Sequence, residues 1–191
     1  MPEPVLTHAH PVIALIGMPG SGKTTVGDLV ARRLDTVFSD CDVEVERRAG
    51  VSIAELFERD GEEVFRELES EALADLVGVA GVAGVAGVVA TGGGAVLRPA
   101  NRQLLRSKTH CVYLRVPTET LIARLRHNKK RPLFLSTDVS ARVHALLNER
   151  HPLYQETAVA VVDTAGLSLS RIADAVLCTL PTAVGDSSEL R

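Results

Sequence analysis

The nine residues 17–25, GMPGSGKTT, decide the fold of this 191-residue chain. They satisfy the P-loop pattern, in which glycines bound a tight turn and a Lys-Thr pair follows the second glycine. The apolar run at residues 12–16 precedes them as an expected strand, and apolar residues at helical spacing follow them. In this strand–loop–helix setting the backbone N–H groups and the helix N-terminus face phosphate oxygens. The stretch therefore predicts binding of a nucleoside triphosphate.

Within this loop, each residue type suits a different part of a bound triphosphate. Lys23 can reach the β- and γ-phosphates, and the Thr24 hydroxyl can bind Mg²⁺. The residues of the loop that are expected to bind the triphosphate are Gly20, Ser21, Gly22, Lys23, Thr24 and Thr25.

A P-loop alone does not separate a switch GTPase, an ATPase motor and a small-molecule kinase. The sequence contains no NKxD-type tetrapeptide that would read guanine, and 191 residues leave little room for a motor's extra domains. These two observations favour a kinase.

The composition narrows the class of protein further. A net charge of −3 and few aromatic residues (two Tyr, four Phe and no Trp) do not suit nucleic-acid binding. Three widely spaced cysteines indicate neither a disulfide framework nor a zinc site, and they fit a reducing cytoplasm. The start of the chain lacks a basic segment, and the apolar run VIALI is too short to be a signal or a membrane span. We expect a soluble, cytoplasmic monomer without a membrane partner.

The spacing of apolar residues predicts an α/β fold. Short β-branched-rich runs alternate with helical patterns, which is typical of a parallel sheet covered on both faces. The chain length suits one domain at residues 11–180, with disordered tails at 1–10 and 181–191. The five expected strands are residues 12–16, 36–39, 88–91, 111–116 and 159–162.

Local signals predict several helix ends. Ser52 with Glu55 matches a capping box, and Gly50 and Gly61 are expected helix stops. The repeat GVAGVAGVAGVV, residues 78–89, has too many glycines for a stable helix, so we interpret it as a flexible connection that becomes a strand at Val88.

Charged residues at the second expected strand raise the question of an acceptor site. In an extended chain, Asp40 and Asp42 of FSDCD would point the same way. They could hold a metal ion and a polyol, or they could belong to a solvated turn.

Two arginines later in the chain also have plain interpretations. Arg66 could form a surface ion pair with Glu69, and Arg150 could end a helix before a proline. Taken singly, the two arginines favour these plain interpretations.

Taken together, the motifs resemble the shikimate kinase family over residues 12–180. They are GMPGSGKTT, FSDCD, GEEVFRELE, TGGGAV, NKKRPL, ERHPLY and VDT, in the order of the family. The resemblance implies a three-layer α/β/α fold like that of P-loop nucleoside-monophosphate kinases, with a five-stranded parallel sheet and a lid at about residues 127–138. It also implies transfer of the γ-phosphate of ATP to the 3-hydroxyl of shikimate, in chorismate and aromatic amino acid biosynthesis.

The resemblance also implies individual roles. Asp40 would support Mg²⁺ through water, Asp42 would hold and orient the acceptor hydroxyl, and Arg131 would close on the transferring phosphate. The implied catalytic residues are Lys23, Asp42 and Arg131. Arg124 would lie near the adenine. The residues implied to bind shikimate are Asp42, Arg66, Gly92, Gly93, Gly94 and Arg150.

Two rival functions share the P-loop. A kinase for another polyol acid, such as gluconate, would not need all of Asp42, Arg66, the three glycines and Arg150 in this order. A nucleotide-gated binding module without turnover would not need Lys23, Thr24, Asp40 and Arg131 together. An ATP-consumption assay with different acceptors separates the three.

Overall fold

The computed structural model describes residues 11–82, 87–126 and 138–181, and its centre is a sheet of five parallel strands. The predicted strands are confirmed, with ends that shift by at most two residues. The spatial order is β2-β3-β1-β4-β5. The strands are β1 (Val12–Ile16), β2 (Val37–Asp40), β3 (Gly87–Ala90), β4 (Thr109–Arg115) and β5 (Ala160–Asp163).

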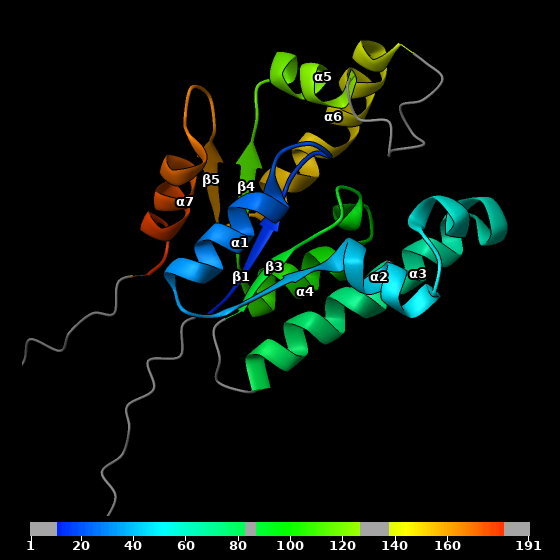
Figure 1. The fold of residues 1–191 in the computed structure, drawn as a ribbon, viewed down its shortest axis with the longest axis horizontal. Coiled ribbons are helices and arrows are strands. Elements are labelled where there is room, and N and C mark those ends of the chain that lie inside the picture. Colours follow the sequence, from blue (N-terminus) through cyan, green and yellow to red (C-terminus); the bar gives the residue numbers. More distant parts are fainter. Residues whose placement is uncertain (1–10, 83–86, 127–137, 182–191) are drawn as a thin grey trace, which may run out of the picture.

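Helices cover both faces of this sheet, which confirms the predicted three-layer α/β/α fold (Figure 1). Helices α1 and α7 pack on one face, and α3, α4 and α6 pack on the other. The helical elements are α1 (Lys23–Arg33), α2 (Cys41–Ala49), α3 (Ile53–Val82), the 3₁₀ turn η1 (Ala95–Leu97), α4 (Pro99–Lys108), α5 (Thr118–Arg126), α6 (Val139–Thr157) and α7 (Leu169–Cys178).

Alternate residues of the central strand build two cores. Ile13 and Leu15 pack with the α1 and α7 side, whereas Val12, Ala14 and Ile16 pack with the side of α3, α4 and α6. All five residues of β1 are buried. An apolar run without polar alternation is what a strand covered on both faces requires.

The topology predicts a ligand site beside the carboxyl end of β1. This strand is followed by α1 on one face, while its neighbours β3 and β4 lead to helices on the opposite face. Chain segments that diverge in this way leave room for a ligand beyond the carboxyl ends of the strands. The loops after β1, β2 and β3 all reach this edge.

The prediction of a flexible connection over residues 78–89 was partly wrong. Helix α3 continues through Val82, β3 begins at Gly87, and residues 83–86 lie outside the described ranges. Glycine in a helix costs only about 1 kcal/mol. The preceding turns are anchored by buried Ala72, Leu73 and Val77, and extending an established helix is easy.

The capping predictions are confirmed. Ser52 and Glu55 exchange hydrogen bonds, with the Ser52 N–H donating to Glu55 Oε2 at 2.9 Å and the Glu55 N–H donating to Ser52 Oγ at 3.2 Å. Gly50 ends α2 in the left-handed conformation. Gly61 breaks the helical path of α3 at a φ of 86°, but the helix resumes at once.

The expected helix end at Arg150 was wrong. Helix α6 continues through Pro152 to Thr157, so Arg150 lies in its interior. Proline removes one backbone donor from a helix. Buried residues on both sides of Pro152, including Arg150 and Tyr154, hold the two halves of α6 against the protein.

Candidate active site

The loop between β1 and α1 is shaped for phosphate by its glycines. Gly20 and Gly22 have φ values of 80° and 90°, which favour glycine because other residues are strained there. Lys23 is buried, and its Nζ donates to the carbonyl oxygens of Gly17 at 2.9 Å and Met18 at 3.0 Å. The ammonium group is therefore held inside the loop whose N–H groups would surround a triphosphate. Ser21 is also buried, while Thr25 is exposed.

Asp40 and Asp42 do not sit on one face of a strand as expected, because α2 begins at Cys41 immediately after β2. Asp40 caps this helix, its Oδ1 accepting from the Asp42 N–H at 2.9 Å. Its other oxygen, Oδ2, accepts from the Thr24 hydroxyl at 2.7 Å. The strand-to-helix turn therefore directs Asp40 to the phosphate loop and places Asp42 in the first turn of the helix.

Arg66 is not the surface residue that the isolated segment favoured. Its side chain is 10% exposed, and its Nη1 donates to Glu69 Oε2 at 2.7 Å in a buried ion pair. Burial raises the pKa of Glu69, although the Arg66 charge opposes it. For Arg66, burial acts to lower the pKa, but the charges and hydrogen bonds of Glu69 and Glu62 together outweigh it and raise the pKa. The remaining donors of Arg66, Nε and Nη2, bond to Glu62, which is 64% exposed.

Arg150 reaches the same region from α6. Its side chain is 6% exposed, and its Nη1 donates to the Gly93 carbonyl at 3.3 Å. Its Nε contacts Glu149, a residue that is 54% exposed. Two buried arginines thus approach the glycines after β3 from different helices, and each also contacts an exposed glutamate.

The three glycines after β3 are needed for space and not for conformation. None of them has a positive φ. A Cβ at Gly92 would overlap Glu69 Oε1, one at Gly94 would overlap the Arg66 guanidinium, and one at Gly93 would lie 2.7 Å from Pro19 Cδ. The backbone therefore packs directly against Glu69, Pro19 and Arg66.

Replacing Gly92 with alanine is expected to raise the KM for the acceptor and lower stability by about 1–3 kcal/mol, because the new methyl group displaces Glu69 and Asp42. Steady-state kinetics and a melting curve test this. Gly78→Ala in α3 is the matched control, because a Cβ there meets open space and should be neutral or stabilising. Equal kinetics in the two variants would contradict the argument.

Of the two remaining predicted residues, the structure describes Arg124 but not Arg131. Arg124 of α5 donates from Nη1 to the Gly20 carbonyl at 3.0 Å, so it lies beside the phosphate loop. Arg131 and nearly all of the predicted lid lie outside the described residues. From that segment only Asp138 is described, as the N-cap of α6.

Sequence reasoning gave two residues too little weight. Glu69 was considered only as a surface partner, yet it is 1% exposed and its Oε1 has no hydrogen-bond partner among the described residues. Tyr154 was quoted only within ERHPLY, yet its hydroxyl donates to Gly93 O at 2.5 Å. The signal for Tyr154 was its spacing, since it lies one helical turn after Arg150 and shares its face.

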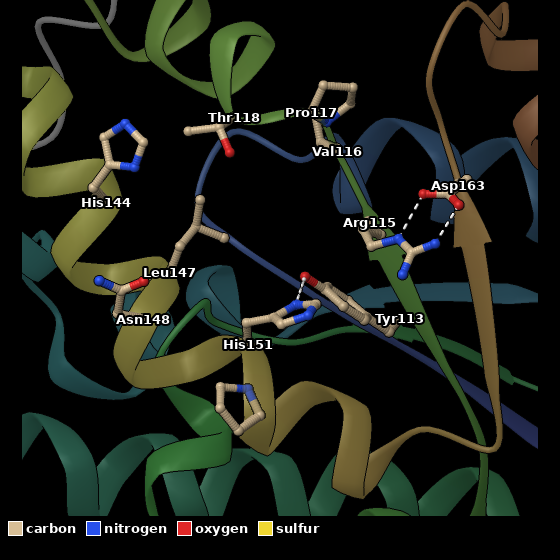
Figure 2. A pocket seen from close by; sticks show the side chains of 11 residues that line it. Tyr113, Arg115, Val116, Pro117, Thr118, His144, Leu147, Asn148, His151 and Asp163 are labelled. Carbon is tan, nitrogen blue, oxygen red and sulfur yellow. Dashed lines mark hydrogen bonds and ion pairs between the residues drawn. The ribbon is translucent and has the colours of Figure 1, made fainter.

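A cleft of about 550 Å³ lies outside this site, between α6 and the carboxyl ends of β4 and β5. Figure 2 shows Tyr113 and His151 pointing toward each other across it, and Arg115 paired with Asp163. None of the predicted site residues that the structure describes lines this cleft.

Two further properties of residues 11–82, 87–126 and 138–181 concern metals and membranes. Within these residues, His, Cys, Asp and Glu side chains do not gather in groups of three or more that could hold a metal ion. None of the described helices combines the length and hydrophobicity needed to cross a bilayer.

Comparisons with known proteins agree on one family. The family model described as "Shikimate kinase" matches residues 19–181. A shikimate kinase of Cupriavidus pinatubonensis is 44% identical over 174 residues, which cover 91% of this chain and 88% of that protein. One of Burkholderia thailandensis is 42% identical, with coverage of 91% and 92%. The solved structure of Acinetobacter baumannii shikimate kinase in complex with shikimate superposes with a TM-score of 0.82 at 37% identity, covering 88% of this chain and 91% of that one.

Proposed function

The chain belongs to the shikimate kinase family, and from this premise we propose how its residues carry out the reaction. The family activity is transfer of the γ-phosphate of ATP to the 3-hydroxyl of shikimate, giving shikimate 3-phosphate for chorismate and aromatic amino acid biosynthesis. The observation that carries the proposal is the meeting of buried Arg66 and Arg150 at the three glycines, beside Asp42 and the phosphate loop.

Arg66 and Arg150 hold the carboxylate of shikimate. Planar guanidinium donors match a carboxylate in pairs, so two arginines determine both its place and its orientation. Each arginine donates hydrogen bonds to an exposed glutamate, Arg66 to Glu62 and Arg150 to Glu149. A substrate carboxylate can replace these glutamates. The buried Glu69 keeps its bond to Arg66 and holds that side chain in place.

Gly92, Gly93 and Gly94 line the ring of the acceptor. Without side chains they leave the ring in contact with the backbone. Asp42 accepts from the hydroxyl that will attack, orienting it and receiving its proton as it reacts. Asp42 lies near the buried carboxyl of Glu69, because a Cβ at Gly92 would lie 2.9 Å from Asp42 Oδ1 and would overlap Glu69 Oε1.

Lys23, Arg124 and Arg131 serve the nucleotide. Lys23 exchanges its bonds to the loop carbonyls for the β- and γ-phosphates, where negative charge grows in the transition state. Arg124 stays beside Gly20 and contacts the adenine end of ATP. Arg131 of the lid closes on the transferring phosphate.

The residues at the end of β2 suit Mg²⁺. This ion prefers hard oxygen ligands and usually keeps several waters. Thr24 Oγ1 and Asp40 Oδ2 lie 2.7 Å apart, so both would face the same ion. The resemblance to the family implies that Thr24 would bind it and that Asp40 would act through water. When bound, Mg²⁺ neutralises charge on the phosphates. We further propose a cytoplasmic monomer with a single kinase domain at residues 11–180.

An assay of ADP release with shikimate, quinate, gluconate or no acceptor tests the function. We expect turnover with shikimate and little with the other three conditions. Preference for gluconate would overturn the assignment in favour of another polyol kinase. Nucleotide binding without turnover on any acceptor would instead favour a binding module.

Replacing Arg66 with lysine is expected to lower kcat/KM for shikimate roughly ten- to hundredfold, on the order of 1.5 to 3 kcal/mol, because lysine keeps the charge but loses the planar donors. Because Arg66 is buried against Glu69, the melting temperature should also fall. The KM for ATP should stay near the wild-type value.

The matched control for Arg66 is Glu62→Gln, which alters the exposed partner and leaves the guanidinium intact. Its shikimate kinetics should be unchanged or slightly improved, because one competitor of the substrate carboxylate is weakened. Wild-type shikimate kinetics in Arg66→Lys would show that Arg66 does not bind the carboxylate.

A further inference from the structure

The carbonyl oxygen of Gly93 is held by two side chains of α6. The Tyr154 hydroxyl donates to it at 2.5 Å, and Arg150 Nη1 donates to it at 3.3 Å. Tyr154 and Arg150 are four residues apart, so they lie on one face of the helix. Both side chains are buried.

In the proposed function Arg150 turns its donors to the shikimate carboxylate, which leaves the hydroxyl of Tyr154 as the donor to Gly93. We propose that Tyr154 is a positioning residue for the acceptor site, holding the Gly93 peptide in the orientation that binds shikimate. This inference rests on the proposed function and adds a residue that the motifs did not assign.

A run of three glycines needs hydrogen bonds from other segments to restrain its backbone. Glycine has more backbone freedom than any other residue, so a segment of three glycines loses more entropy on ordering than other segments. The peptide unit is planar and trans, so fixing the Gly93 oxygen also fixes the direction of the Gly94 N–H, which points the opposite way. One hydroxyl can therefore set the direction of a backbone donor.

The surroundings of Tyr154 keep its hydroxyl in place as a donor. Burial raises the pKa of Tyr154, so the group stays protonated at physiological pH. Its ring stacks on Tyr113 with centroids 4.9 Å apart, and its oxygen lies 3.9 Å from Met18 Sδ. Tyr113 is itself anchored, because its hydroxyl and His151 Nδ1 are 3.0 Å apart at the cleft in Figure 2.

The test is the variant Tyr154→Phe, which keeps the ring and removes the hydroxyl. Losing one buried hydrogen bond should raise the KM for shikimate about tenfold, with kcat and the KM for ATP near their wild-type values. Calorimetric titration with shikimate alone should show the same loss without turnover. A structural defect of α6 would instead move both KM values and kcat together.

Tyr113→Phe is the matched control. It removes a hydroxyl from the stacked partner and breaks the bond to His151, but it leaves the bond to Gly93 intact. Its shikimate KM should stay within about twofold of wild type, since the bond that it breaks, to His151, does not hold the Gly93 peptide. An equal rise in the two variants, or a wild-type KM in Tyr154→Phe, would overturn the inference.

If Tyr154→Phe does not fold, amide hydrogen exchange in the unaltered chain tests whether the Gly93–Gly94 peptide takes part in binding shikimate. Shikimate should slow exchange at Gly94 more than ATP does, and unchanged exchange would overturn the inference. If the unaltered chain neither binds nor phosphorylates shikimate, the proposed function fails and this inference fails with it. Normal wild-type activity with normal Tyr154→Phe kinetics removes this inference alone.

Discussion

Replacing Lys23 with alanine is expected to abolish phosphoryl transfer, with a loss in kcat of at least about a thousandfold. The side chain supplies the cation that would face the β- and γ-phosphates, where charge accumulates in the transition state. Removing it also removes the bonds to the carbonyl oxygens of Gly17 and Met18, so the loop can loosen and ATP affinity can fall. Single-turnover kinetics at saturating ATP separates the two effects.

Lys108→Ala is the control for loss of a positive charge, because Lys108 is exposed at the end of α4. Its kinetics should match the wild type, since charges at the surface are screened by salt. If Lys23→Ala kept a kcat near wild type at saturating ATP, the phosphate loop would have no catalytic part in the reaction.

Replacing Asp42 with asparagine is expected to lower kcat by about a hundred- to ten-thousandfold, because the amide cannot take the proton of the attacking hydroxyl. Nucleotide affinity should be largely kept. The cap of α2 also survives, since Asp40 accepts from the backbone N–H of residue 42 and not from its side chain. The melting temperature should therefore change little.

The comparison variant is Asp40→Asn, one position before the helix. Asp40 contacts the Thr24 hydroxyl, so its loss should raise the Mg²⁺ concentration needed for half-maximal activity. Asp42→Asn should show no such shift. Equal changes of Mg²⁺ dependence in the two variants would mean that both carboxylates serve the metal and that neither is dedicated to the acceptor.

Signals that depend on neighbours in the chain were predictable. The P-loop, the five strands and the capping box of Ser52 and Glu55 follow from spacing and from residue type. Helix ends were less predictable, because there the local preference of a residue competes with packing against distant parts of the chain. Glycines at 78–82 did not stop α3, and Pro152 did not stop α6, because buried residues on the same helices outweighed their local cost.

The sequence by itself determined the phosphate-binding loop, the parallel α/β layers and, through seven motifs in order, the family. Only the tertiary structure decided which charged residues belong together. Arg66 looked like a surface residue and proved to be buried on Glu69, and the spacing of Tyr154 after Arg150 did not show that its hydroxyl would contact Gly93. The reason is physical: burial and hydrogen-bond partners come from segments far apart in the chain, and spacing along one segment does not encode them.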